Sequence, residues 1–368
     1  IAWGILVLVL LAMLISSTLR LTNKRENFEV FDKLMRQDGS TPLTWMARWN
    51  GMAYWANKAE SAAFAYRLVG NVAIAFPDPV GAPRAVGQSI RQFEEFCAKN
   101  GWTVCYFSVR EKTAAALAAK GYAKASVGED SVIYLKDLEF AGKKWQSVRS
   151  AINGAEKRGM RMETFALVDA SPEIRQKLRD IAESWVADKS LPEMGFTLGT
   201  LNEAEDPEVI MNIAIDNEGM VHGMTSWMPV YEKGKIVGRT IDIMQRSLDE
   251  NAAHGIMEYL IAKSAMKFKE QGEQFISLSA APLANSSEHK TSLEKLMLVL
   301  ADRLEPYYGF KSLFNFKKKF QPVHVPIYLC YKDEAQLPAI SSAIGRAYMN
   351  DMSYAVALTS IAKKKLSK

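Results

Sequence analysis

Apolar and polar positions beyond residue 25 repeat one order of elements twice: strand, long helix, strand, short helix and strand. Apolar residues recur at helical spacing in the first long helix, as at Ile90, Phe93 and Phe96. Short apolar runs on either side of it are typical of strands. The first half is therefore predicted to contain a strand at 71–76, a helix at 84–99, a strand at 103–109, a helix at 113–120 and a strand at 131–135.

The second half repeats this order with two additional strands in front. Gly101 and Gly272 end the long helix at the matching place in each half. A glycine beside an aromatic residue precedes the last strand, at Gly121-Tyr122 and at Tyr308-Gly309-Phe310. The predicted elements are strands at 211–215, 221–229 and 235–244, a helix at 252–270, a strand at 274–280, a helix at 292–304 and a strand at 325–331.

The order of elements resembles that of GNAT-type acyltransferases, and two such units account for a length of 368 residues. The expected fold class is therefore α/β (α+β, with mixed sheets), built as tandem GNAT-type folds joined by a basic helix. The expected organisation is a transmembrane helix at 1–20, an N-terminal GNAT-like domain at 26–140, a basic connecting helix at 141–162, a C-terminal GNAT-like catalytic domain at 163–335 and a helical tail at 336–368.

The N-terminal run from Ile1 to Ile15 is apolar apart from one glycine, and the first charged residue is Arg20. A helix of this length nearly spans the hydrocarbon core of a bilayer, which is about 30 Å thick. Lys24 and Arg25 also follow the run, and by the positive-inside tendency these charges place the rest of the chain in the cytoplasm. We expect the end of a longer membrane segment, with a buried core helix as the alternative.

Positive charge gathers in the segment 143–161, where six basic residues stand against one acid, Glu156. The whole chain has a net charge of +5, which is compatible with a polyanionic partner, and its 48% hydrophobic content excludes overall disorder. We interpret the segment as a surface that binds RNA phosphates, against the alternative of a merely solvated helix. Its basic residues are Lys143, Lys144, Arg149, Lys157, Arg158 and Arg161.

Cysteine and histidine usage argues against a metal centre. Cys97, Cys105 and Cys330 form no CxxC pair and no even disulfide framework, which indicates a reducing compartment. The four histidines have no metal-binding spacing. The stretch 248–255 stands where coenzyme-A-dependent GNAT enzymes carry a glycine-rich pyrophosphate loop, but it has one glycine and two acids. We therefore expect no metal and no organic cofactor, coenzyme A included.

Six stretches between Trp145 and Tyr331 resemble, in the same order, motifs of the multiple peptide resistance factor family, the lysyl- and alanyl-phosphatidylglycerol synthases. Three of them carry most of the likeness: LPEMGFTLG matches the motif LPE-x-x-F-x-x-G, GRTIDIMQR the central strand, and FKKKFQP the closing F-K-x-K-F-x-P. The six stretches are 151–159, 191–199, 238–246, 255–261, 280–284 and 316–322.

The resemblance implies an aminoacyltransferase that moves an amino acid, lysine or alanine, from aminoacyl-tRNA to the headgroup hydroxyl of phosphatidylglycerol. The reaction is expected at the cytoplasmic face of a bacterial cell membrane, where it alters membrane charge and resistance to cationic peptides. The implied partners are aminoacyl-tRNA, phosphatidylglycerol and other membrane lipid, and an upstream flippase-like membrane part, with room for a homo-oligomer. Two departures bear on specificity: Gln245 replaces an arginine, and His324 replaces an aromatic residue, often Trp.

Asp242, at the end of the predicted central strand, is the candidate for orienting or deprotonating the lipid hydroxyl, with a salt-bridged structural aspartate as the alternative. Strand alternation would turn Ile241 and Ile243 to the opposite face. Lys317 and Lys319 would share one side of an extended segment and clamp a phosphate, whereas on a helix they would diverge. Arg246 is a second candidate for binding a phosphate, with a surface ion pair as the alternative. Glu258 is either a site carboxylate or an exposed helix residue. Substrate contacts are expected from Ser279 and Asn285, although turns favour these residue types in any case.

Two other hypotheses stay open. A different lipid acceptor, another glycerolipid or a sterol, would change the substrate within the same class of enzyme. A non-catalytic, membrane-tethered module that only binds lipid or RNA belongs to a different class, and Gln245 is the feature that favours it.

Overall fold

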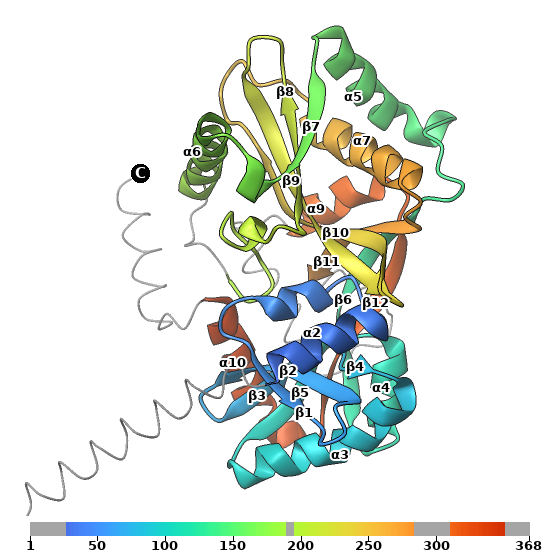
Figure 1. Cartoon of the computed structure of the whole chain (residues 1–368), viewed down its shortest axis with the longest axis vertical. Coiled ribbons are helices and arrows are strands. Elements are labelled where there is room, and N and C mark those ends of the chain that lie inside the picture. Colours follow the sequence, from blue (N-terminus) through green and yellow to red (C-terminus); the bar gives the residue numbers. More distant parts are fainter. Residues whose placement is uncertain (1–26, 189–194, 283–309, 350–368) are drawn as a thin grey trace, which may run out of the picture.

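The computed structural model describes residues 27–188, 195–282 and 310–349. Their strands form one twelve-stranded mixed sheet that runs through both halves of the chain (Figure 1). The first half comprises α2 (Phe28–Gln37), η1 (Thr44–Arg48), β1 (Ala53–Ala56), β2 (Ala62–Val69), β3 (Val72–Ala75), β4 (Val80–Gly81), α3 (Pro83–Lys99), β5 (Thr103–Val109), α4 (Glu111–Ala118) and β6 (Ala123–Tyr134).

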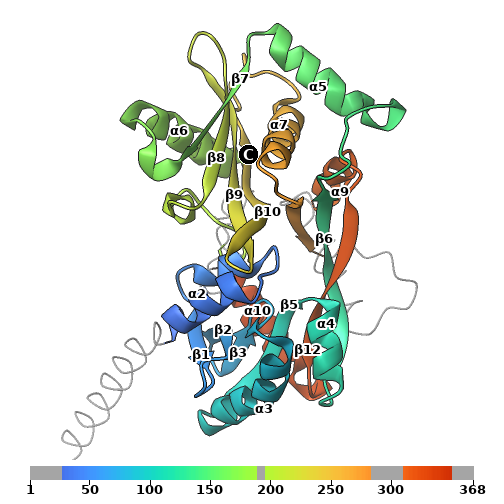
Figure 2. The same ribbon diagram turned by 45° about the vertical axis from the view of Figure 1, so that its right-hand side comes forward.

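The second half begins with the basic segment, and its helices α6 and α7 lie on opposite sides of the strands between them (Figure 2). Its elements are η2 (Lys143–Trp145), α5 (Gln146–Lys157), β7 (Arg161–Ala166), η3 (Leu167–Asp169), α6 (Pro172–Asp188), η4 (Glu203–Glu205), β8 (Ile210–Ile215), β9 (Val221–Glu232), β10 (Lys235–Arg246), α7 (Ile256–Glu270), β11 (Phe275–Pro282), α9 (Phe310–Lys318), β12 (Val323–Tyr331), η5 (Glu334–Gln336) and α10 (Leu337–Tyr348).

The two halves interleave their closing strands. The strand order is β1-β2-β3-β5-β12-β6-β11-β10-β9-β8-β7, with β4 paired to β2. Strand β12, the last of the second half, therefore lies between β5 and β6 of the first half, and β6 in turn pairs with β11. The division into domains at 26–140 and 163–335 stays a prediction, but the sheet itself does not divide along those ranges.

The predicted α/β class with a mixed sheet is confirmed. In the first half the predicted order appears as β3, α3, β5, α4 and β6. In the second half, α7 begins at Ile256 and not near residue 252, because Gly255 before it takes a left-handed conformation (φ 75°) that a helix cannot continue through. The helix α9 was not predicted. The predicted helix at 292–304 lies outside the described residues.

Each half contains one parallel strand pair that separates at the same point. Pairing of β3 with β5 ends at Ala75 and Tyr106, and pairing of β10 with β11 ends at Thr240 and Ser277. Just beyond, Ser108 (φ 59°) and Ser279 (φ 63°) both take the left-handed conformation, 171 residues apart. The separation of β10 from β11 leaves room for side chains between the strands, and the candidate site lies there.

Helix α2 joins the two halves. It packs against β2 of the first half and β9 of the second. Phe31 and Met35 are fully buried in a cluster that also holds Met228 of β9, and burying such side chains contributes roughly 1.5–3 kcal/mol each. Arg36 adds a two-pronged ion pair with Glu208, at 2.9 and 2.5 Å. The two halves therefore share one apolar core across this contact.

Two predicted segments fall at the ends of the chain. The predicted transmembrane helix at 1–20 lies outside the described residues, and among the described residues no helix is both long and apolar enough to cross a membrane. Helix α10 occupies the start of the predicted tail at 336–368, of which residues 350–368 are also outside the described part.

Candidate active site

A cavity opens where β10 and β11 separate, and α9 closes one side of it. Among its lining residues Asp242 and Lys317 are ionisable, and most of the others are apolar. The lining consists of Thr197, Leu198, Ile241, Asp242, Met244, Ile261, Leu278, Ser279, Ala280, Leu313, Phe316 and Lys317. The structure thus brings together three of the predicted site residues: Asp242, Ser279 and Lys317.

The backbone around Asp242 departs from regular strand alternation. Strand β10 shifts register against β9 between Ile241 and Met244. As a result Ile241 packs in one apolar cluster with Trp227, while Ile243 packs in another. The prediction that Ile241 and Ile243 share the face opposite Asp242 is therefore wrong, because a bulge re-aims the side chains. Ile241 and Asp242 line the same cavity.

The Asp242 carboxylate is held by a backbone amide. The amide N–H of Gly199 donates to its Oδ1 atom at 3.0 Å. Burial raises the pKa of Asp242 to about 7, and the nearby Glu203 charge adds to the rise, while the Gly199 hydrogen bond opposes it. Asp242 can therefore gain or lose a proton near neutral pH.

The Lys317 ammonium reaches the cavity from the last turn of α9. Its side chain is 4% exposed, and its Nζ donates to the carbonyl oxygens of Ser279 at 3.1 Å and Ala280 at 3.4 Å. Burial lowers the pKa of Lys317 to about 8, and the charge of Asp130 opposes that effect. The cavity therefore holds a carboxyl and an amine whose pKa values are shifted toward each other.

Lys317 and Lys319 do not share a side. Both leave the C-terminal end of α9, a helix, so the prediction of a clamp on an extended segment is wrong. Lys319 instead pairs with Glu258 of α7 at 2.7 Å. Glu258 and Lys319 thus satisfy each other, and neither lines the cavity.

The remaining predicted residues of this part lie elsewhere. Arg246 is exposed at the end of β10, and its Nη1 atom lies 3.5 Å from the Ser247 carbonyl oxygen. Gln245 is half-buried beside it, and its Oε1 atom has no hydrogen-bond partner among the described residues. Asn285 falls outside the described residues.

The predicted RNA-binding residues lie on η2, on α5 and just beyond it. Lys143, Lys144, Lys157 and Arg158 are exposed, as a phosphate-binding surface requires. Arg149 differs, since its Nη1 atom donates to the carbonyl oxygens of Phe140 at 3.0 Å and Gly142 at 2.6 Å. That side chain holds the start of the helix in place. Binding of RNA to the others stays a prediction.

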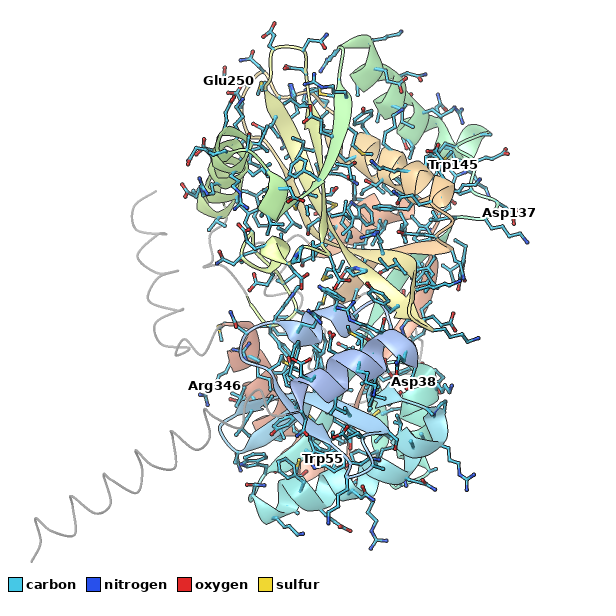
Figure 3. The ribbon with its side chains drawn as sticks, viewed as in Figure 1. Asp38, Trp55, Asp137, Trp145, Glu250 and Arg346 are labelled. Atoms are coloured by element: carbon cyan, nitrogen blue, oxygen red, sulfur yellow. The ribbon has the colours of Figure 1, made fainter. Side chains whose placement is uncertain are left out.

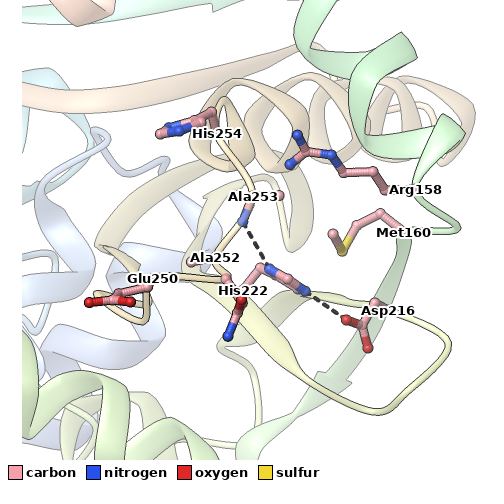
Figure 4. A pocket seen from close by; sticks show the side chains of 9 residues that line it. Arg158, Met160, Asp216, His222, Glu250, Ala252, Ala253 and His254 are labelled. Atoms are coloured by element: carbon pink, nitrogen blue, oxygen red, sulfur yellow. Dashed lines mark hydrogen bonds and ion pairs between the residues drawn. The ribbon is translucent and has the colours of Figure 1, made fainter.

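A second, polar pocket lies at the end of α5, beside the loop before α7 (Figure 4). His222 joins two of its walls: its Nε2 atom lies 3.0 Å from Asp216, and its Nδ1 atom accepts from the Ala253 amide at 3.0 Å. A neutral imidazole with its proton on Nε2 satisfies both contacts. Arg158 and His254 are among the other lining residues. The histidine fixes the loop and so the start of α7.

Sequence reasoning missed several of these contributors. Gly199 was noticed within a motif but not as a hydrogen-bond donor, because that role appears only when its amide meets Asp242. Trp49 of the first half also reaches this point, within 3.1 Å of where a Cβ on Gly199 would stand. His222 and Asp216 carried no signal, since their pairing depends on a hairpin and a distant loop.

Fold and cavity together define an α/β domain with one mixed sheet and a carboxyl and an amine in a mostly apolar site. A family model described as phosphatidylglycerol lysyltransferase, C-terminal, matches residues 31–331, and the chain belongs to this family. The resemblance inferred from the sequence motifs is thereby confirmed.

Individual relatives agree with this assignment. The chain is 38% identical to an uncharacterised protein of Corynebacterium glutamicum over 323 residues, 86% of the chain and 40% of the relative. It is 26% identical to the lysylphosphatidylglycerol biosynthesis bifunctional protein LysX of Mycobacterium marinum over 290 residues, 77% of the chain and 25% of LysX. The chain therefore spans well under half the length of these relatives.

Two solved structures share the fold. The structure of L-PGS from Bacillus licheniformis superposes with a TM-score of 0.75 at 23% identity, covering 88% of this chain and 95% of the other. The C-terminal domain of a putative lysylphosphatidylglycerol synthetase from Agrobacterium fabrum gives a TM-score of 0.75 at 22% identity, covering 89% of this chain and 99% of the other.

Proposed function

We propose that the chain transfers an amino acid, lysine or alanine, from aminoacyl-tRNA to a headgroup hydroxyl of phosphatidylglycerol. Membership of the family supports the class of reaction. The observation that carries the proposal is one apolar cavity that contains both Asp242, with a pKa of about 7, and Lys317, with a pKa of about 8.

The proposed step uses both groups. Ionised Asp242 accepts the proton of the lipid hydroxyl, whose oxygen attacks the carbonyl carbon of the aminoacyl ester. The carbonyl oxygen gains negative charge, which the Lys317 ammonium stabilises. The bond from that carbon to the terminal ribose oxygen then breaks, and the ribose oxygen takes the proton from Asp242. Atoms and protons balance without a cofactor, and holding the two substrates together contributes further.

The apolar walls favour transfer over hydrolysis. Leu278, Leu313 and Phe316 line the cavity, and an activated ester in such surroundings meets few water molecules. Low polarity also strengthens the interaction of Lys317 with a developing negative charge. The same walls suit a substrate whose headgroup is attached to apolar chains.

The RNA would lie along the basic segment. Lys143, Lys144, Lys157 and Arg158 are exposed and would neutralise phosphates of the tRNA acceptor arm. Arg149 is not assigned to this surface, because its guanidinium binds carbonyl oxygens of its own chain.

The proposal sets the pH dependence. Activity rises with pH as Asp242 loses its proton near pH 7, and it falls as Lys317 loses its proton near pH 8. The sign follows because the base must be ionised and the ammonium protonated in the same molecule. We expect a narrow bell-shaped profile whose maximum lies between these two values.

The test is synthesis of aminoacylated lipid from tRNA charged with labelled lysine or alanine and phosphatidylglycerol vesicles, read by thin-layer chromatography. Asp242→Asn should lower product formation about 10²–10⁴-fold, the usual contribution of a general base. Asp137→Asn is the matched control, because Asp137 is an exposed carboxylate at the edge of the molecule (Figure 3).

Full activity of Asp242→Asn would remove the assignment of the base. Binding of phosphatidylglycerol without product from any charged tRNA would instead favour a non-catalytic binding module. Product with another glycerolipid, and none with phosphatidylglycerol, would favour a different acceptor.

We also place the domain on the cytoplasmic side of a bacterial cell membrane. The support is the apolar run 1–15, with Arg20, Lys24 and Arg25 after it. Protease added outside intact cells should leave residues 27–349 uncut, and cleavage there would contradict the placement.

A further inference from the structure

A buried chain of polar contacts links the first half to the candidate site. It starts at Asp130 on β6, whose side chain is 0% exposed. The Asp130 carboxylate accepts from Arg110 Nη2 at 2.5 Å and from Ser277 Oγ at 2.5 Å. Arg110 belongs to the first half, whereas Ser277 lies on β11 in the second. Asp130 therefore binds one partner from each half.

Ser277 passes the contact on to the cavity. Its Oγ atom donates to Asp130 and accepts from the Ser279 amide at 2.9 Å. Ser279 takes a left-handed conformation (φ 63°), which costs a non-glycine residue energy and persists only where its surroundings hold it. The Ser279 carbonyl oxygen accepts from Lys317 Nζ at 3.1 Å. The contacts thus run unbroken from Asp130 through Ser277 and Ser279 to Lys317.

Electrostatics gives Asp130 a second effect on the same side chain. A buried ammonium is costly unless a negative charge lies near it, and the charges of Asp130 and Lys317 act on each other. Asp242 is the other carboxyl at this cavity, on β10. Glu258 on α7 forms an ion pair with Lys319, and Arg110 forms an ion pair with Asp130. Among the described groups, Asp130 acts on Lys317 both through its charge and, indirectly, through the hydrogen bonds of Ser277 and Ser279.

We propose that Asp130, on β6 of the first half, is a positioning residue for Lys317. Its negative charge keeps the Lys317 ammonium protonated, and its hydrogen bonds through Ser277 and Ser279 keep that ammonium directed into the cavity. The inference rests on the proposed function for the use made of Lys317. It makes the first half a working part of the site, because without β6 the carboxylate that holds Lys317 is gone.

The test measures the titration of Lys317 in the full chain without substrate. Lysine side chains are labelled with carbon-13, and the Lys317 signal is assigned by its loss in Lys317→Arg. In Asp130→Asn the titration midpoint should fall by about one pH unit, since an opposite charge nearby shifts a pKa by one unit or more. The alkaline limb of the pH–activity profile should move to lower pH by the same amount.

Two further variants separate charge from structure. Ser277→Ala keeps the Asp130 charge but removes the bridge, so kcat should fall about tenfold through misplacement of Lys317 while the limb stays near its wild-type pH. Asp78→Asn is the matched control: Asp78 is also a buried carboxylate of the first half, and it accepts from the Arg110 amide at 3.0 Å. We expect Asp78→Asn to leave the Lys317 titration unchanged.

An unchanged Lys317 titration in Asp130→Asn would overturn the inference, whatever the activity. A shifted titration with an unmoved alkaline limb would support the action of Asp130 on Lys317 but contradict the use of Lys317 in the proposed reaction. If Asp78→Asn shifts the Lys317 titration equally, the shift in Asp130→Asn reflects a general disturbance of the fold, and the inference fails. If the wild-type chain makes no aminoacylated lipid, the proposed function fails, but the titration still decides whether Asp130 holds Lys317.

Discussion

At the scale of single residues, Gly199 connects a sequence motif to the chemistry of the site. Its amide donates to the Asp242 carboxylate at 3.0 Å, the one backbone contact that opposes the upward shift of that pKa. A Cβ at this position would collide with the carboxylate and approach Trp49 to 3.1 Å. The position therefore requires glycine because of what lies against it, and its own backbone conformation imposes no such need.

Gly199→Ala should displace the Asp242 carboxylate from the amide that holds it. We expect kcat to fall about 10–100-fold, because a displaced base loses its alignment with the hydroxyl. The acidic limb of the pH profile should move to higher pH, since the hydrogen bond that favours the ionised form is weakened. Steady-state kinetics from pH 6 to 9 measures both effects.

Gly87→Ala is the control for this substitution. Gly87 lies in α3, and nothing approaches a Cβ there within 4 Å. Unaltered kinetics in Gly199→Ala, with a melting temperature like that of the control, would mean that the glycine does not position Asp242.

At the scale of elements, the periodicity of apolar residues predicted those helices and strands whose bounds depend on the local sequence. Helix α3 and strand β5 were placed within one residue of their observed bounds, because α3 has a regular apolar face and β5 is a short, mostly apolar run that is buried on both faces. The register shift between Ile241 and Met244 was not predictable, since it depends on how β10 meets β9. Helix α9 was missed because its basic end resembles an extended charged segment as much as a helix.

The candidate site shows the same division. Asp242 and Lys317 were named from motifs, but their meeting in one cavity depends on α9 lying against β11. Lys317 lies in the last turn of α9, whereas Lys319 lies in the turn just after the helix ends, and its side chain pairs with Glu258 away from the cavity. Nothing in the sequence pointed to Asp130, because its role depends on a contact between the two halves that appears only in the fold.

Helix α5 gives a prediction about its exposed basic end. Lys157→Glu with Arg158→Glu should weaken binding of tRNA and make its salt dependence shallower, because fewer counterions are released. The slope of log affinity against log salt should decrease by about 1–2, measured by filter binding from 50 to 200 mM salt.

The control for that pair is Lys112→Glu with Lys120→Glu, which makes the same change of charge at exposed positions in α4 and just beyond its end. A slope that changes equally in both double variants would show that only net charge matters. No change in the α5 variant would leave the helix as a solvated surface.

At the scale of the whole molecule, the interleaved sheet makes the two halves interdependent. Strand β12 pairs with β5 on one side and β6 on the other, and β6 also pairs with β11. Helix α2 adds an apolar contact with β9 and the ion pair of Arg36 with Glu208. The tandem order of elements in the sequence therefore does not translate into two separable sheets, because strand partners are set by the fold and not by chain order.

The last prediction concerns separation of the halves. A fragment of residues 141–349 lacks β6, so β11 loses its antiparallel neighbour and β12 loses both of its partners. Unpaired backbone groups and an uncovered apolar surface should leave this fragment aggregated or molten. A fragment of residues 27–140 should also be aggregated or molten, since β5 and β6 would both lack their partner β12. Circular dichroism and size-exclusion chromatography of each fragment measure this.

The matched control is the full chain cut by a protease at a site inserted next to Gly142, in the exposed connection between β6 and α5. Because the strands are already interleaved when the cut is made, the two pieces should stay together and keep the melting temperature within a few degrees. A fragment 141–349 that unfolds cooperatively on its own would show that the shared strands add little, and that the second half holds its site without Asp130.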